Sequence, residues 1–112
     1  MSPPQGDMGS ILKQLHAGQI VSPQASAAMI EMLKLCNDRR MIPRDLKPDI
    51  PIAHKIGSSG RIKGDVGLIF LPTGPLVVSA FALASGDGVR GDEAIAEIAR
   101  LAVEVFSPKS IV

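Results

Sequence analysis

The segment GDVGLIFLPTGPLVVSAFALA, residues 64–84, constrains the fold more than any other part of the chain. Two runs rich in β-branched and aliphatic residues, 64–72 and 76–84, flank the turn sequence P-T-G-P. Short apolar runs bounded by proline and glycine favour strands joined by a tight turn. The segment is therefore predicted to form an antiparallel hairpin that turns at residues 72–75. A shorter strand is predicted at residues 52–56, ahead of the hairpin.

Helical periodicity precedes this sheet. In residues 7–18 the apolar positions recur at steps of three and four, with Asp7 as a candidate cap and Gly18 as a left-handed stop. Residues 22–40 repeat the pattern, with Ser22 as the candidate N-cap and Pro23 at the first helical position. The predicted apolar stripes consist of Met8, Ile11, Leu12 and Leu15 in the first helix, and of Ala25, Met29, Met32, Leu33 and Cys36 in the second.

Residues 37–51 contain three prolines and many charged side chains, so they are predicted to cross the surface as a connection with a short turn at residues 42–46. After a loop at residues 85–91, helical periodicity returns in residues 92–106, with acidic Asp92 and Glu93 at the start. The predicted class is α+β, with helices packed on a three-stranded antiparallel meander, as a single domain or subdomain over residues 1–112. The last helix has one apolar face made of Ala94, Ile98, Leu101 and Val105.

Composition argues against several classes of function. Aromatic residues are only 3% of the chain and the net charge is +1, so we expect no nucleic-acid partner. His16 is interpreted as a surface residue and Cys36 as a small core residue, and no cluster of His, Cys and carboxylates has metal spacing. We therefore expect no metal or other cofactor. No run of 18 apolar residues and no signal-peptide pattern occurs, which predicts no membrane span.

The segment HKIGSSGRIKGDVG, residues 54–67, permits three interpretations. In the first, a strand ends in a loose turn and Lys55 is solvated. In the second, the G-x-x-G at residues 57–60 clamps a nucleic-acid backbone as KH domains do, but that motif needs a following helix, and a strand is predicted here. In the third, the strand presents Lys55 to a site.

Lys55 with Gly57 resembles the K-T-G element of the penicillin-recognising serine hydrolases, the β-lactamases and penicillin-binding proteins. PIAHKIG, residues 51–57, is similar to the P-V-A-H-K-T-G common in class A β-lactamases, and residues 7–26 resemble their paired helices. The hairpin and last helix then follow in the family's order. The resemblance covers residues 4–107 and implies the C-terminal part of the β-lactamase/transpeptidase-like fold, in a periplasmic or secreted protein.

The resemblance implies roles for four consecutive residues. Lys55 takes the place of a catalytic and substrate-binding lysine, whose ammonium attracts the substrate carboxylate and shapes the field around the nucleophile. Ile56 stands where the family has Thr or Ser, and it cannot donate the hydrogen bond to that carboxylate, a loss of roughly 1.5 to 3 kcal/mol. Gly57 permits close approach of the substrate, and the Ser58 backbone N–H supplies half of the oxyanion hole.

The resemblance also implies an arginine that helps to bind the substrate carboxylate, and a serine nucleophile. Gly64 stands at one place that the arginine can occupy, and Arg40 or Arg44 is a candidate to reach the site from the connection. In the family, the S-x-x-K nucleophile, the S-D-N element and the glutamate of the omega loop all precede the matched region, and we expect all three to be absent from this chain. The serines that lack a correctly spaced lysine are Ser22, Ser26, Ser58 and Ser107.

The chain is thus predicted to be the C-terminal part of a serine hydrolase that binds and hydrolyses β-lactams or related amides and esters when complete, and to be inactive alone. The alternative is a non-catalytic binding or structural domain that retains the fold, which Ile56 favours. In the family, two strands from the N-terminal half lie beside residues 76–84, so that strand is predicted to be an exposed edge about 30 Å long. The expected macromolecular partner is the missing N-terminal portion, or a second copy bound through residues 76–84.

Overall fold

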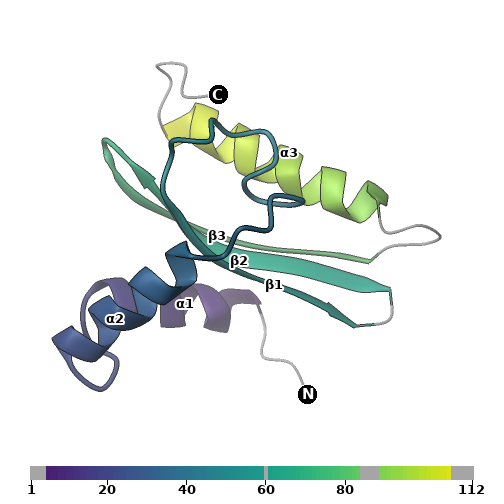
Figure 1. The fold of residues 1–112 in the computed structure, drawn as a ribbon. Coiled ribbons are helices and arrows are strands. Elements are labelled where there is room, and N and C mark those ends of the chain that lie inside the picture. The colour runs from purple at the N-terminus through teal and green to yellow at the C-terminus, as the bar shows by residue number, and fades with distance from the viewer. Residues whose placement is uncertain (1–4, 60, 84–88, 107–112) are drawn as a thin grey trace.

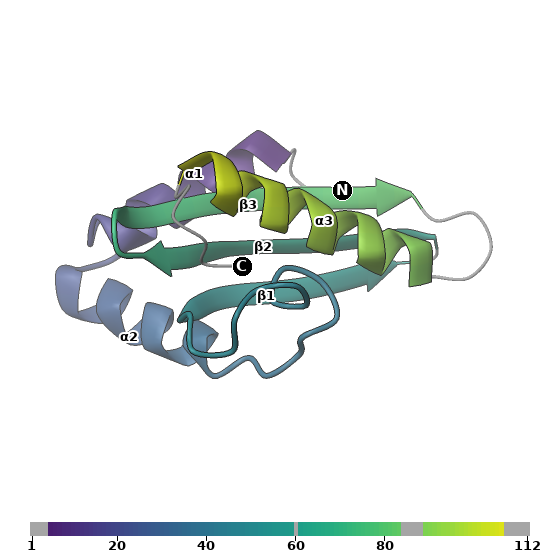
Figure 2. The ribbon, with the colours of Figure 1, turned by 90° about the horizontal axis from the view of Figure 1, so that it is seen from above.

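The computed structural model describes residues 5–59, 61–83 and 89–106. In these ranges the sheet lies between two helical layers (Figures 1 and 2). Helices α1 and α2 cover one face, and α3 covers the other together with the connection between α2 and β1. The predicted α+β class is confirmed. The elements in chain order are α1 (Gln5–His16), α2 (Pro23–Lys34), β1 (Ile52–Ser59), β2 (Ile62–Leu71), β3 (Gly74–Leu83) and α3 (Val89–Phe106).

The three strands form the predicted antiparallel meander in the order β1-β2-β3. The β2–β3 hairpin closes with Leu71 opposite Gly74, whose φ of +125° is one that side-chain-bearing residues rarely adopt. Strand β1 runs three residues further than predicted, to Ser59. The glycines expected to end it are instead paired across the ladder, Gly57 opposite Gly64.

The face of the sheet toward α1 and α2 holds a small apolar core. Leu12 of α1 packs there with Ala53, Val66 and Leu68 of the sheet. Leu15 is buried as well. The predicted stripes are only partly correct, because Ile11 and Met32 are exposed.

The helix boundaries are set by local hydrogen bonds. Helix α1 begins at Gln5, so Asp7 lies in its first turn and is not the cap, whereas Gly18 does have the predicted positive φ, 75°. Ser22 caps α2 as predicted, because its Oγ accepts a hydrogen bond from Ala25 N at 3.0 Å. Helix α2 ends at Lys34, two residues before Cys36, the last member of its predicted stripe, and shortly afterwards the Asp38 carboxylate accepts from Arg40 N and holds a local turn.

The opposite face holds the larger core, to which the connection contributes Met41 and Ile42, both fully buried. The predicted turn is present, since Arg44 N bonds to Met41 O and Leu46 N to Pro43 O. The remaining buried members of this core come from the connection, from all three strands and from α3: Leu46, Ile52, Ile69, Leu71, Val78, Ala80, Ile95, Ala99 and Val103.

Helix α3 begins at Val89, three residues before its predicted start, and is apolar on two sides. One side is buried against the sheet through Ile95, Ala96, Ala99 and Val103. The face identified in the sequence is the other one, and its members Ile98, Leu101 and Val105 are 49%, 46% and 72% exposed. We call Ala94, Ile98, Leu101 and Val105 the outer stripe of α3. The predicted loop at residues 85–91 lies mostly outside the described residues.

Candidate functional site

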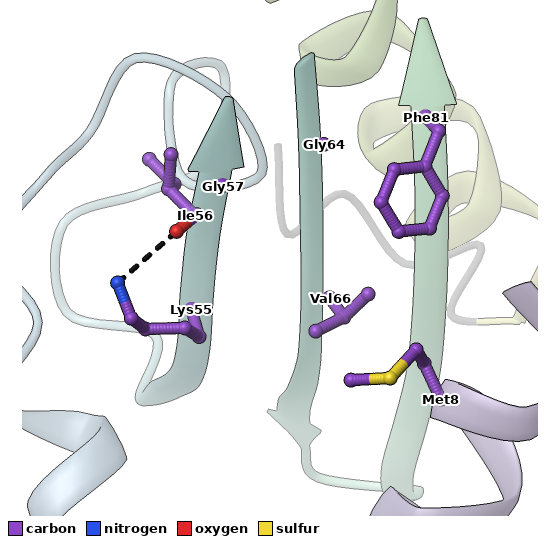
Figure 3. A pocket seen from close by; sticks show the side chains of 7 residues that line it. All are labelled: Met8, Lys55, Ile56, Gly57, Gly64, Val66 and Phe81. Carbon is purple, nitrogen blue, oxygen red and sulfur yellow. Dashed lines mark hydrogen bonds between the residues drawn. The ribbon is translucent and has the colours of Figure 1, made fainter. Parts of the chain in front are cut away.

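Lys55 lies at a pocket of about 220 Å³ on the α1 side of the sheet (Figure 3). The lysine is exposed, and its Nζ donates to the Ile56 carbonyl at 3.1 Å. No carboxylate of the described residues lies within ion-pair distance of this ammonium group. The pocket therefore combines an unpaired cation with mainly apolar walls. The lining residues are Met8, Lys55, Ile56, Gly57, Gly64, Val66 and Phe81.

Two glycines and one aromatic ring shape the end of this pocket. Gly57, Gly64 and Phe81 are opposite one another across the three strands. A Cβ on Gly64 would lie 2.2 Å from Cδ1 of Phe81, so the ring covers the space that a side chain there would need. A Cβ on Gly57 would meet nothing within 4 Å. The β1 side of the pocket is therefore open to an approaching molecule, and the β3 side is walled by Phe81.

The backbone of β1 presents polar groups to its free edge. Phe70 N donates to Pro51 O at 3.0 Å, which identifies that pair as a hydrogen-bonded position of the antiparallel ladder. Since such positions alternate with non-bonded ones, the N–H and C=O groups of Ile56 and Ser58 point away from β2. The Lys55 bond to Ile56 O agrees with this assignment. The Ser58 N–H is thus directed toward the unpaired edge of the sheet.

The side chain of Ile56 lies on the opposite face of the sheet from Lys55. Ile56 is half-buried and packs against the larger core, so its contribution to the pocket comes from the main chain beside Lys55. The side chain of Ser58 is exposed and does not line the pocket. Of the four residues predicted at the site, Lys55, Ile56 and Gly57 line the pocket and Ser58 follows them on the strand.

The structure does not bring the two candidate arginines to this pocket. Arg40 pairs with Asp38 at 2.8 Å, and its hydrogen bonds lower the pKa of that carboxyl group. Arg44 lies 3.8 Å from Glu93 of α3. Gly64 lines the pocket but carries no side chain.

One S-x-x-K spacing does occur in the sequence, at Ser10 to Lys13, and the sequence interpretation overlooked it. Both residues are exposed on α1, whereas Leu12 and Leu15 of that helix are buried. Neither Ser10 nor Lys13 lines the Lys55 pocket. This lysine is solvated and the serine is outside the pocket, so the pair is not arranged as an activated nucleophile. Ser107 lies outside the described residues.

His16 and Cys36 match their predicted roles only in part. His16 is an exposed residue in the last turn of α1, as predicted, with its ring centroid 6.2 Å from that of Phe70. Cys36 is half-buried rather than a core residue, and it lines a second pocket of about 240 Å³. Among the described residues, no group of three or more His, Cys, Asp and Glu side chains could hold a metal ion.

The sequence interpretation missed a buried pair beside Lys55. His54 Nδ1 lies 3.0 and 3.1 Å from the two carboxylate oxygens of Asp65, and both side chains are buried. The alternation of inward and outward side chains in β1 could have indicated this pair, because His54 occupies an inward position between Ile52 and Ile56. A polar residue at such a position needs a polar partner, and Asp65 is the acidic residue of strand β2.

Comparison with known proteins identifies the family. A model of the β-lactamase enzyme family matches residues 5–106, a range that includes every described residue. The chain belongs to the β-lactamase enzyme family. Its fold is that of the C-terminal portion of class A β-lactamases and of PBP-A. No curated protein sequence gives a significant match.

Two solved β-lactamase-family structures show how much of the fold is present. A β-lactamase from Sphaerobacter thermophilus DSM 20745 superposes with a TM-score of 0.85 at 30% identity, over 93% of this chain and 40% of that one. PBP-A superposes with a TM-score of 0.78 at 26% identity, over 91% of this chain and 39% of its own. The chain thus spans about 40% of the length of these relatives.

A third structure shares the fold at lower identity. The chromosome-encoded β-lactamase of Vibrio parahaemolyticus has a TM-score of 0.77 at 18% identity, over 92% of this chain and 40% of that one. No helix in the described part of this β-lactamase-family chain is both long enough and apolar enough to cross a membrane.

Proposed function

We propose that this chain supplies the substrate-binding strand of a serine hydrolase that acts on β-lactams or related amides and esters. The carrying observation is Lys55, which lies beside an apolar pocket on an edge strand and whose ammonium group has no ion-pair partner among the described residues. A fixed cation there attracts the carboxylate of a β-lactam more strongly than it would in open water. Membership of the family supports this choice of substrate, as does the acyl-enzyme complex of a PBP-A variant with penicillin G.

Each of the four site residues then has a physical role. Lys55 binds the substrate carboxylate and raises the positive potential around the reacting carbonyl. Gly57 leaves the edge open for the ligand backbone, and the Ser58 N–H donates to the developing oxyanion. Ile56 leaves the carboxylate without the hydroxyl donor of the usual motif, and this favours a second candidate, a non-catalytic domain that binds such ligands without hydrolysing them.

The nucleophile belongs, on this proposal, to an N-terminal portion that packs against the present residues. The coverage of about 40% of the relatives supports such a portion. Two surfaces of the described residues are suited to receive it: the side of β3 that faces away from β2, at the end of the sheet, and the outer stripe of α3. Unpaired strand edges and exposed apolar stripes both favour association. Alternatively, a second copy of this chain occupies the edge of β3 and binds through residues 76–84. The family relationship also supports a periplasmic or secreted location.

The test is nitrocefin hydrolysis by the full-length gene product. Lys55→Ala should lower kcat/KM by at least about tenfold, since a hydrogen bond to a charged group contributes roughly 1.5 to 3 kcal/mol. Lys47→Ala removes an exposed lysine of the connection, away from the pocket, and should leave the rate unchanged. Turnover that is equal in both variants would refute the role of Lys55. Binding of penicillin G without turnover would support the non-catalytic domain.

A further inference from the structure

The buried pair of His54 and Asp65 joins three segments that are distant in the sequence. His54 belongs to β1 and Asp65 to β2, and the Asp65 Oδ2 also accepts a hydrogen bond from the backbone N–H of Ile42 in the connection, at 3.0 Å. The exposed fractions of His54 and Asp65 are 1% and 0%. A carboxylate buried to this extent requires its donors, so the three segments are held together at one point.

The sheet is built to accommodate the imidazole. His54 lies directly opposite Gly67, and Asp65 lies opposite Ile56, so the pair is a diagonal contact on the core-facing side. A Cβ on Gly67 would lie 2.7 Å from Cβ of His54 and 2.8 Å from the carbonyl oxygen of Ala53. The absence of a side chain at residue 67 therefore lets β1 approach β2 closely at the position of His54.

Lys55 follows His54 and points to the opposite face. Among the described strands, β1 has one neighbour, β2, so backbone pairing within the sheet restrains it from one side. The lysine itself has no ion pair among the described residues, and its ammonium group contacts only the adjacent Ile56 carbonyl. The direction of the Lys55 side chain is consequently set by the twist and register of β1, because successive residues of a strand are fixed relative to each other.

We propose that His54 is a positioning residue for Lys55. By bonding to Asp65 it fixes the rotation of β1 about its own axis, and so sets the direction in which the Lys55 side chain leaves the strand beside the pocket. The His54 Nε2 atom has no hydrogen-bond partner among the described residues, so Nδ1 carries the polar contact of the ring. This inference rests on the proposed function only for the identity of the ligand that Lys55 binds.

The hydrogen-bond donor that His54 presents to Asp65 can be removed and restored by matched substitutions. His54→Leu keeps an apolar body of similar size but leaves Asp65 without its side-chain donor. His54→Asn places an amide nitrogen near the position of Nδ1 and can donate to the same carboxylate. Each change is made in the wild-type chain and in Lys55→Ala. The readouts are the dissociation constant for penicillin G by calorimetry and amide hydrogen exchange in the absence of ligand.

The expected result is specific to Lys55. His54→Leu should weaken penicillin G binding about tenfold in the wild-type chain and less than twofold in Lys55→Ala, as expected for residues that act through one another. Without ligand, exchange at Lys55 and Gly57 should quicken at least about tenfold, while exchange at Ala99 and Val103 of α3 stays unchanged. His54→Asn should restore both properties.

Several results would overturn the inference. Equal losses of affinity in both backgrounds, or unchanged exchange at Lys55 in a folded His54→Leu chain, would leave His54 as an ordinary core residue. If His54→Leu does not fold, His54→Met serves in its place, because its flexible apolar side chain likewise cannot donate to Asp65. Failure of the wild-type chain to bind penicillin G would refute the proposed function, while the exchange data would still decide the role of His54.

Discussion

Replacing Gly67 with alanine tests the close approach of β1 and β2 that positions the candidate site. The added methyl carbon would lie 2.7 Å from His54 Cβ and 2.8 Å from Ala53 O, distances below any normal contact. One of these atoms is backbone and the other is directly attached to it, so neither can rotate away. The two strands must separate, and the His54–Asp65 contact must lengthen with them.

The expected cost follows from the contacts at three glycines of the same sheet. Forcing a methyl group into a packed site typically costs about 1 to 3 kcal/mol, and we expect Gly67→Ala in the upper part of that range. Gly64→Ala should cost less, because it meets the Phe81 ring, which is 38% exposed and can turn toward solvent. Gly57→Ala is the matched control: nothing lies within 4 Å and its φ is not positive, so it should be neutral or stabilising by up to about 1 kcal/mol.

Urea unfolding followed by circular dichroism measures these differences. With a slope of roughly 1 to 3 kcal/mol/M, Gly67→Ala should lower the midpoint by about 1 M relative to the wild-type chain. The order of stability should be Gly57→Ala, then Gly64→Ala, then Gly67→Ala. A Gly67→Ala midpoint equal to that of Gly57→Ala would refute the claim that the two strands are in forced proximity beside His54.

Two further predictions concern other parts of the molecule. Leu101→Lys on the outer stripe of α3 should leave the unfolding midpoint nearly unchanged but reduce self-association in light scattering, whereas Val103→Lys on the buried side should prevent folding. Hydrogen bonds from Arg100 lower the pKa of Glu97 below its ordinary value of 4.5, so this pair stabilises the fold above that pH and its contribution is lost on acidification. Arg100→Gln should therefore reduce stability at pH 7 more than at pH 3 in thermal unfolding, and an equal effect at both pH values would contradict the assignment.

The sheet was predictable because its signals are local. The P-T-G-P turn and the flanking apolar runs specify a hairpin without reference to the rest of the chain. The buried face of α3 was not predictable, because the helix is apolar on two sides and its periodicity alone does not show which side packs on the sheet. Only the sheet selects Ile95, Ala99 and Val103 for burial. The early end of α2 was missed for a related reason, since the Asp38 turn competes with helix continuation.

The candidate site was predictable only along its own strand. Lys55, Ile56 and Gly57 are adjacent in the sequence, and the resemblance to a known motif located them together. The walls of the pocket come from Met8 and Phe81, whose proximity depends on how α1 packs across the sheet. The pairing of His54 with Asp65 likewise depends on strand register, which the pattern of each strand alone does not specify.

The most direct test of the central claim is an NMR titration of the chain with penicillin G. Backbone amide shifts should change at the residues around the pocket, above all Lys55, Gly57 and Val66, and Lys55→Ala should abolish the changes while Lys47→Ala retains them. The shift changes at a given penicillin G concentration should become smaller as salt is added, because the attraction between Lys55 and the ligand carboxylate is electrostatic and the lysine is exposed. Shift changes that persist in Lys55→Ala, or that occur instead around Cys36 and the second pocket, would contradict the claim that Lys55 binds the ligand.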